Sequence, residues 1–296
     1  MDRKKFGKLI SALRKEQLDR YNVSWTRQRL ADESGIDQEI LANIETGRRA
    51  ILYPDLLVQL ADALNLTSGE RREFFLAASG VDEEHIYQPL DTSKTALGDM
   101  LAVMDKLQQP AFLVDQYFDI VAVNPMVLEI YNVNVNNFLD PESDPVTRFN
   151  LLRFLFASEF DEQKAMLGVF REKFTMTTLM LFRASSLRYR ATEYFLRLYR
   201  HLYEIEDLKT YIQRKPKNER YVDNNMFINL DNPRLGEIRS ISTSVTIAST
   251  AGELKLFALT PLSEETAKIF TSLAHLNNYV FQPLPDWPNK DVLNEK

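Results

Sequence analysis

The residues best suited to chemistry lie close together between positions 27 and 49 of this 296-residue chain. The amides of Gln38 and Asn43 could bond bidentately to adenine, and the Glu39 carboxylate could accept a hydrogen bond from cytosine N4. A methyl group such as that of Ala42 suits contact with the methyl group of thymine. The same stretch contains a hydroxyl and three guanidinium groups that could contact a nucleic-acid backbone: Thr46, Arg27, Arg48 and Arg49. Together these residue types predict a surface that contacts double-stranded DNA.

Two short helices must position these side chains, and residues 26–47 (TRQRLADESGIDQEILANIETG) contain the signals for both. Gly35 can adopt the left-handed conformation that ends the first helix, and Asp37 can cap the second. The second helix would then present its N-terminal residues to the major groove, as in a helix-turn-helix. The alternative interpretation is a plain helical bundle with a glycine turn. The positions expected to face inward are all small or apolar: Leu30, Ala31, Ile36, Ile40, Leu41 and Ile44.

Residues 1–80 as a whole predict a bundle of about five short helices. Thr67 and Glu70 have the spacing of a capping box, and Gly80 can end the helix that this box begins. Residues 1–50 carry 11 Lys and Arg against 8 Asp and Glu, a net charge of +3, whereas the rest of the chain carries −9. The positive charge is therefore concentrated where DNA contact is expected.

Several classes of function lack support in this sequence. The chain has no cysteine, and His85, His201 and His275 are too far apart to show metal-ligand spacing. No glycine-rich phosphate loop or nucleophile motif is present. No apolar run approaches the roughly 18 residues that a membrane span needs, and the N-terminus lacks the features of a secretory signal. We therefore expect a cytoplasmic protein without a metal, a cofactor or a catalytic site, which does not associate with membranes.

The second half of the chain has a different pattern. Short β-branched runs at 111–115 and 118–123 predict a hairpin, and strand patterns return at 226–230, 237–248 and 253–259. Between these two groups of strands, residues 146–212 are helical in pattern. The fold class is therefore α+β. We expect a DNA-binding bundle at 1–80, a linker or connecting helix at 81–104, an antiparallel-sheet domain with a helical insertion at 105–280, and an irregular tail at 281–296.

The helical insertion is rich in Phe, Leu and Met between residues 151 and 182. Such a stripe is more often plain core than a binding site, but this composition also suits a deep apolar pocket, because methionine adapts to flexible ligands. The residues selected as candidates for lining a pocket are Leu152, Phe156, Met166, Phe170, Phe174, Leu179 and Met180.

Residues 26–47 resemble the helix-turn-helix of the Cro/repressor (XRE) class of DNA-binding proteins. The resemblance implies that Gln38, Glu39 and Asn43 occupy base-reading positions. It also places Arg27 where the class often has a glutamine that contacts phosphate. Carboxylates at Asp37 and Glu39 are unfavourable near phosphate, which would leave affinity dependent on the arginines.

Dispersed blocks of the second half resemble the ligand-binding domain of MmyB-like transcription regulators. The blocks are PAFLVDQYFDIVAVNPMVLEIY, FNLLRFLF, NPRLGEI and LTPLSEETAKIFTSL. The tryptophans that are usual in this family are absent from these blocks, because Trp25 and Trp287 both lie outside them. The resemblance implies a PAS-like fold and a sensor for a small apolar molecule such as a fatty acid. A carboxylate headgroup would need a basic anchor, for which Arg148, Arg153 and Arg183 are candidates, although a solvated surface position is the more common outcome for any one arginine.

Together, these features predict a homodimeric transcription regulator whose second domain senses a small apolar ligand. The dimer follows from function, because helix-turn-helix regulators bind half-sites related by two-fold symmetry. The alternative is an antitoxin-like or scaffold protein whose second domain binds another protein. A pocket predicts internal burial of the apolar insertion, whereas a scaffold predicts an exposed patch.

Overall fold

The computed structural model describes residues 1–19, 21–81, 92–138, 143–213, 226–276 and 279–290. Residues 82–91 of the expected linker, with His85, lie outside these residues. The described chain forms two compact units, each built from segments that are distant in sequence. Unit 1 comprises residues 1–88, 180–197 and 217–222, and unit 2 comprises residues 89–179, 198–216 and 223–296. The sequence-based boundaries placed the whole helical insertion in the second domain, whereas residues 180–197 of the insertion belong to unit 1.

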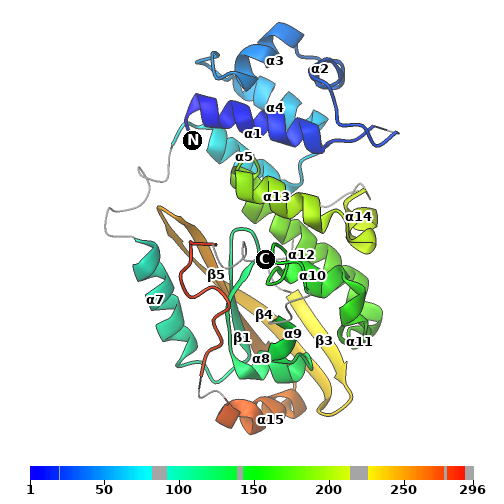
Figure 1. The fold of residues 1–296 in the computed structure, drawn as a ribbon, viewed down its shortest axis with the longest axis vertical. Helices are drawn as coiled ribbons and strands as arrows, with labels where there is room; N and C mark the ends of the chain where they lie inside the picture. The colour runs from blue at the N-terminus through cyan, green and yellow to red at the C-terminus, as the bar shows by residue number, and fades with distance from the viewer. Residues whose placement is uncertain (20, 82–91, 139–142, 214–225, 277–278, 291–296) are drawn as a thin grey trace. The chain divides into compact units, whose positions relative to one another are not determined.

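Unit 1 is helical, as predicted (Figure 1). Thr67 and Glu70 form the expected capping box, in which each side chain bonds the other residue's backbone N–H. The core of this unit includes Phe6, Leu30 and Phe74, and Leu187 from residues 180–197 packs into it. Its helices are α1 (Arg3–Glu16), α2 (Arg27–Ser34), α3 (Gln38–Glu45), α4 (Pro54–Ala63), α5 (Ser68–Ala78) and the 3-10 turn η3 (Leu187–Tyr189).

A buried ion cluster ties residues 180–197 to the N-terminal helices of unit 1. Glu70 accepts hydrogen bonds from Arg183 Nε (3.0 Å) and Nη2 (3.1 Å) and from Arg190 Nη2 (2.5 Å). Arg190 also donates to Glu16 Oε2 at 2.8 Å. Burial raises the pKa of Glu70, but the charges of Arg183 and Arg190 outweigh it and lower that pKa to about 2. The cluster therefore holds a fully buried glutamate in its charged form.

Unit 2 is built on a five-stranded antiparallel sheet in the order β2-β1-β5-β4-β3 (Figure 1). The predicted hairpin and the three later strands are present, so the α+β class is confirmed. Helix α7 (Ser93–Met104) packs against β1, β4 and β5. The strands are β1 (Ala111–Asp115), β2 (Ile120–Val123), β3 (Met226–Asn232), β4 (Gly236–Ser249) and β5 (Gly252–Pro261).

The helical insertion lies between β2 and β3, as expected, but it consists of short pieces. Helix α12 crosses the division between the units, with residues 171–179 in unit 2 and 180–186 in unit 1. The sheet is followed by α15 (Glu264–Leu273) and the 3-10 turn η4 (Ala274–Leu276). The pieces of the insertion are α8 (Pro125–Ile130), α9 (Val135–Phe138), α10 (Leu151–Phe156), η1 (Ser158–Phe160), α11 (Asp161–Ala165), η2 (Gly168–Phe170), α12 (Arg171–Ser186), α13 (Glu193–Leu202) and α14 (Glu206–Gln213).

The C-terminal segment is irregular in backbone but anchored to unit 2. Phe281 pairs with Val123 beside β2, and Leu284 and Trp287 are buried. The Lys290 ammonium lies between the carboxylates of Asp115 and Asp119 and bonds to both. Burial and the neighbouring Asp119 raise the pKa of Asp115 to about 6, despite the opposing charge of Lys290.

Candidate functional site

Helices α2 and α3 meet at the predicted glycine turn. Thr26 Oγ1 accepts a hydrogen bond from Arg29 N and so caps α2. Gly35 ends α2 with φ of +69°, a conformation that favours glycine. Asp37 Oδ1 then accepts from the backbone N–H groups of Glu39 (2.8 Å) and Ile40 (3.3 Å). Both helices, the Gly35 turn and the Asp37 cap are therefore present where the sequence predicts them.

The two faces of α3 differ in exposure as expected. Leu41 and Ile44 are buried, together with Leu30 and Ile36 from the preceding segment. On the outer side, the candidate base-reading residues Gln38 and Glu39 are exposed, and Ala42 and Asn43 are half-buried. The N-terminal end of α3 therefore presents polar side chains that the core does not use.

Glu45 connects α3 to two other helices. Its carboxylate accepts from Arg14 Nε (2.7 Å) and from Arg27 Nη2 (2.8 Å). Burial raises the pKa of Glu45, but the hydrogen bonds from both arginines outweigh it and leave that pKa below its usual value. Arg27, a candidate phosphate contact, thus has its guanidinium held by Glu45, with 37% of its side chain exposed.

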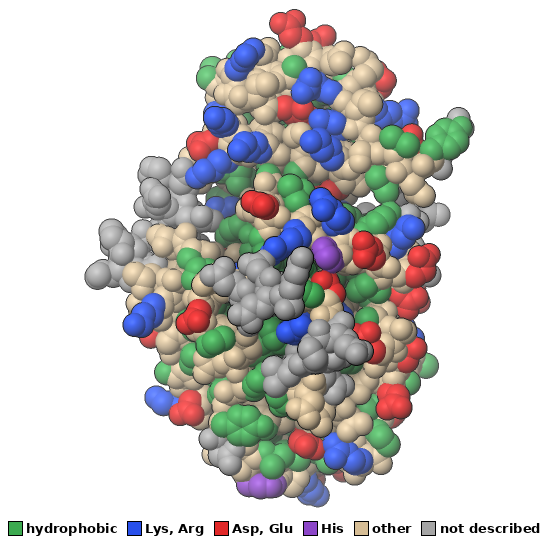
Figure 2. All heavy atoms as spheres, viewed as in Figure 1, with side chains coloured by type: hydrophobic (Ala, Val, Ile, Leu, Met, Phe, Trp, Pro, Cys, Tyr) green, Lys and Arg blue, Asp and Glu red, His purple; other side chains and the backbone are tan. Residues whose placement is uncertain are grey.

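The end of α3 lies against the start of α1. Gly47 has φ of +73°, and a Cβ added there would lie 2.8 Å from Lys4 Cα, so glycine is required for this approach. The Thr46 hydroxyl donates to Ala42 O at 2.8 Å and remains exposed. Arg48 is exposed and Arg49 is half-buried. The fold also brings the exposed Lys4 close to Gly47, a proximity that its position in the sequence did not indicate. Figure 2 shows Lys and Arg side chains gathered over these helices.

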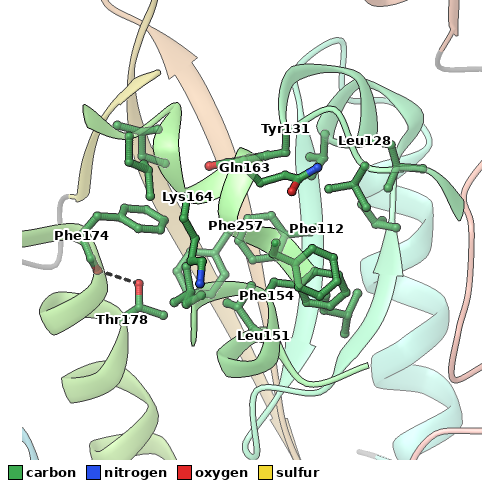
Figure 3. A pocket seen from close by; sticks show the side chains of 18 of the residues that line it. Phe112, Leu128, Tyr131, Leu151, Phe154, Gln163, Lys164, Phe174, Thr178 and Phe257 are labelled. Carbon is green, nitrogen blue, oxygen red and sulfur yellow. Dashed lines mark hydrogen bonds between the residues drawn. The ribbon is translucent and has the colours of Figure 1, made fainter. Parts of the chain in front are cut away.

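Unit 2 contains an apolar cavity of about 100 Å³ between the sheet and the helical insertion (Figure 3). Apart from Tyr131, Gln163, Lys164 and Thr178, every lining side chain is aliphatic or phenyl. The apolar lining residues are Phe112, Phe118, Ile120, Val123, Val127, Leu128, Val133, Leu151, Phe154, Leu155, Phe160, Leu167, Phe174, Ile228 and Phe257.

Strand register explains why the sheet side of this cavity is apolar. Phe112 of β1 pairs with Phe257 of β5 and with Val123 of β2. Residues directly opposite each other in antiparallel strands share a face, so all three side chains point into the cavity. The Phe112 and Phe257 rings stack, with centroids 5.1 Å apart.

The polar groups of the cavity come mainly from α11. The Lys164 side chain is only 2% exposed, and its ammonium donates to Phe156 O at 3.3 Å and pairs with Asp161 at 2.5 Å. Gln163 donates from Nε2 to Asn132 O at 3.0 Å, whereas its buried Oε1 has no partner among the described residues. Burial raises the pKa of Tyr131 well above its usual value, so its hydroxyl stays protonated.

Comparison with known proteins identifies the family to which the sheet and cavity of unit 2 belong. Residues 97–273 match the model of the MmyB-like transcription regulator ligand binding domain, over more than half of the chain. The chain belongs to this family. The match covers the sheet, the insertion and the cavity, which lies inside the MmyB-like domain. A search of curated proteins finds no match.

Most of the predicted ligand-binding residues are not among those that line the cavity of the MmyB-like domain. Phe174 lines it. Leu152, Phe156, Met166 and Leu179 are buried elsewhere in unit 2, Met180 is buried in unit 1, and Phe170 is 42% exposed.

The three candidate anchor arginines all have other partners. Arg148 donates to Ser143 Oγ at 3.0 Å, Arg153 pairs with Glu159 at 2.6 Å, and Arg183 pairs with Glu70 in unit 1. The charged lining residue is instead Lys164, which sequence reasoning did not select. Its available signal was a lysine between the apolar runs 151–156 and 166–170.

Other kinds of site receive no support from the described part of the chain. Within it, no group of three or more His, Asp or Glu side chains could hold a metal ion. His201 and His275 instead have Asp144 and Ser272 O as neighbours. Nor is any described helix long and apolar enough to cross a membrane.

Proposed function

We propose that the chain is a cytoplasmic, homodimeric transcription regulator that binds specific DNA sites through α2 and α3. In this proposal its MmyB-like domain senses a small apolar ligand, for which a fatty acid is the first candidate. The observation that carries the proposal is the apolar cavity inside the domain that matches a ligand-binding family. Pockets for small molecules combine such walls with a few polar groups.

The surface of α3 supports the DNA-binding half of the proposal. Gln38 and Glu39 are exposed at the N-terminus of α3, the end that a helix-turn-helix inserts into the major groove. Lys4 and Arg48 are exposed beside its C-terminal end, where cations could contact phosphates. The buried Glu45 keeps α3 in place through Arg14 and Arg27.

Helix α12 supports a mechanism that connects the two functions. It contributes Phe174 and Thr178 to the cavity, and its last two turns contribute Arg183 to the ion cluster of unit 1. A ligand that binds two arrangements of α12 with different affinity would shift the population of the DNA-binding form. Ligand occupancy would then change the preferred spacing between the two DNA-binding bundles of a dimer.

The DNA half is tested with Asn43→Ala and Arg48→Ala on the best site selected from a random DNA pool. Loss of the Asn43 amide should weaken that site by about 1–3 kcal/mol and relax the preference at one base position. Loss of Arg48 should weaken all sequences alike and reduce the salt slope by about one phosphate contact. Arg72→Ala, at an exposed position on α5, is the control. If both variants bind like wild type, α3 does not contact DNA.

A protein-binding second domain is the competing function, and one observation favours it. Val169 and Phe170 in η2 are 90% and 42% exposed, although most of the apolar insertion is buried. Native mass spectrometry of purified protein, followed by organic extraction, separates the two functions. Co-purified small molecules would support the sensor, whereas ligand-free protein without thermal stabilisation across a fatty-acid panel would support the scaffold.

A further inference from the structure

Lys164 is the only charged side chain among the described residues that line the apolar cavity. Figure 3 shows its nitrogen among the side chains of Leu151, Phe154 and Thr178, and the Lys164 side chain is only 2% exposed. An ammonium is costly to remove from water unless it is paired and hydrogen-bonded. Its position in this wall therefore requires both a counter-charge and hydrogen-bond acceptors.

The protein supplies only part of what this ammonium needs. Lys164 has three N–H donors. Two of them are used by Phe156 O at the end of α10 and by the Asp161 carboxylate. Asp161 is itself 68% exposed, so water already solvates it and it remains on the outer side of α11. A third acceptor can therefore approach Lys164 from the cavity.

Gln163, the residue before Lys164, provides a second polar group in the cavity wall. The Nε2 group of Gln163 donates to Asn132 O, which fixes the orientation of the amide. Its Oε1 is buried without a partner among the described residues and faces the phenyl groups of the wall in Figure 3. An unsatisfied buried acceptor is destabilising, so a ligand that carries a donor is favoured over a plain hydrocarbon.

We propose that Lys164 is the anchor for the carboxylate of an amphipathic monocarboxylic acid whose alkyl chain fills the cavity. Gln163 accepts a hydrogen bond from a hydroxyl on that chain. This inference rests on the proposed ligand-sensing function and narrows its ligand class from apolar molecules to hydroxylated alkyl acids. It assigns the anchoring role to Lys164 in place of Arg148, Arg153 and Arg183.

The test compares decanoate with decan-1-ol, which has the same chain without the charge, by isothermal titration calorimetry. Lys164→Met keeps the aliphatic stem and is close to volume-conserving, and it leaves Asp161 solvated. Lys164→Arg restores the cation. The control is Lys173→Met, the same substitution at an exposed position on α12. Thermal unfolding of each variant shows that it is folded.

Wild type and Lys173→Met should bind decanoate more tightly than decan-1-ol. Lys164→Met should lose at least about tenfold in decanoate affinity and little in decan-1-ol affinity, since hydrogen bonds to charged groups contribute about 1.5–3 kcal/mol. Lys164→Arg should recover part of the loss. Equal effects of Lys164→Met on the acid and the alcohol, or no effect on either, would overturn the anchor while leaving the sensor intact. If neither compound binds wild type, the proposed function itself fails.

The role of Gln163 is measured with 2-, 3- and 10-hydroxydecanoate against decanoate. One of the three should bind wild type about two- to tenfold more tightly than decanoate, the range expected for one net hydrogen bond. Gln163→Leu should abolish that preference and leave the dependence on Lys164 unchanged. Equal binding of all four acids by wild type would contradict this part of the proposal.

Discussion

Each unit of the molecule contains a buried ion cluster, and the two clusters differ in their ratio of cations to carboxylates. In unit 1, Glu16 and Glu70 face two arginines, and Glu70 bonds to both. In unit 2, Asp115 and Asp119 share one ammonium, that of Lys290. The pKa of Glu70 is lowered to about 2, and that of Asp115 is raised to about 6. The pKa of a buried carboxylate is therefore lowered where two cations bond to it and raised where two carboxylates share one cation.

This difference predicts which cluster is more sensitive to loss of a charge. Arginine cannot release its proton in a protein, so a guanidinium left without its carboxylate stays buried and charged. A carboxylate left without its cation can take up a proton and become neutral. Breaking the unit 1 cluster at its glutamate should therefore cost more than breaking the unit 2 cluster at its lysine.

The largest effect is expected for Glu70→Gln. Glutamine can keep the capping box with Thr67, but Arg183 and Arg190 lose the carboxylate that they share, and Glu16 alone then faces both arginines. Unit 1 should lose about 3–5 kcal/mol of unfolding free energy in urea denaturation. Glu33→Gln, which breaks an exposed pair with Arg29 one helical turn away, should cost about 0.5 kcal/mol or less. Similar losses in the two variants would contradict the account of the cluster.

A smaller loss is expected for Lys290→Met in unit 2. The variant leaves Asp115 and Asp119 buried without a cation, but protonation of one of them limits the cost to about 2–3 kcal/mol at pH 7. Lys268→Met, at an exposed position on α15, is the control and should change stability by less than about 0.5 kcal/mol. A Lys290→Met effect larger than that of Glu70→Gln would reverse the comparison.

The smallest effect is the pH dependence of wild-type stability that each carboxylate contributes. The raised pKa of Asp115 stabilises unit 2 below its unfolded pKa of about 3.9, and this contribution is lost as pH rises through about 6. The lowered pKa of Glu70 stabilises unit 1 above its unfolded pKa of about 4.3, and this contribution is lost as pH falls toward 2.

Unfolding free energies measured from pH 7 to pH 4 check these signs. Asp115→Asn should flatten the increase in the stability of unit 2 on acidification, whereas Glu70→Gln should leave the profile of unit 1 unchanged until about pH 4.5. Burial and the charge of Glu70 both raise the pKa of Glu16, so the two Glu70 proteins are compared in a Glu16→Gln background, where Glu16 does not titrate. A flattened unit 1 profile above pH 5 in Glu70→Gln would contradict the assigned pKa.

Short-range signals explain what the sequence could predict. Gly35, Asp37 and the Thr67–Glu70 capping box act within a few residues, so their helix boundaries are readable from local spacing. Periodicity likewise predicted the strands and the inward face of α3.

The cavity and the ion clusters depend on contacts between residues far apart in sequence. Phe112 meets Phe257 through strand pairing, and Arg183 reaches Glu70 across 113 residues. Local composition marked residues 151–182 as apolar but could not distinguish core residues such as Leu152 from lining residues such as Leu151. The buried position of Lys164 follows from how α11 packs, which no local pattern reports.

The central claim is that an acid in the cavity controls DNA binding. The most direct measurement is the affinity of full-length protein for its selected DNA site, without ligand and with saturating decanoate, at fixed salt. The claim predicts a change of at least about fivefold in wild type, the lower range of measured allosteric couplings, and no change in Lys164→Met at the same decanoate concentration. Equal DNA affinity of ligand-free and ligand-saturated wild type would contradict it.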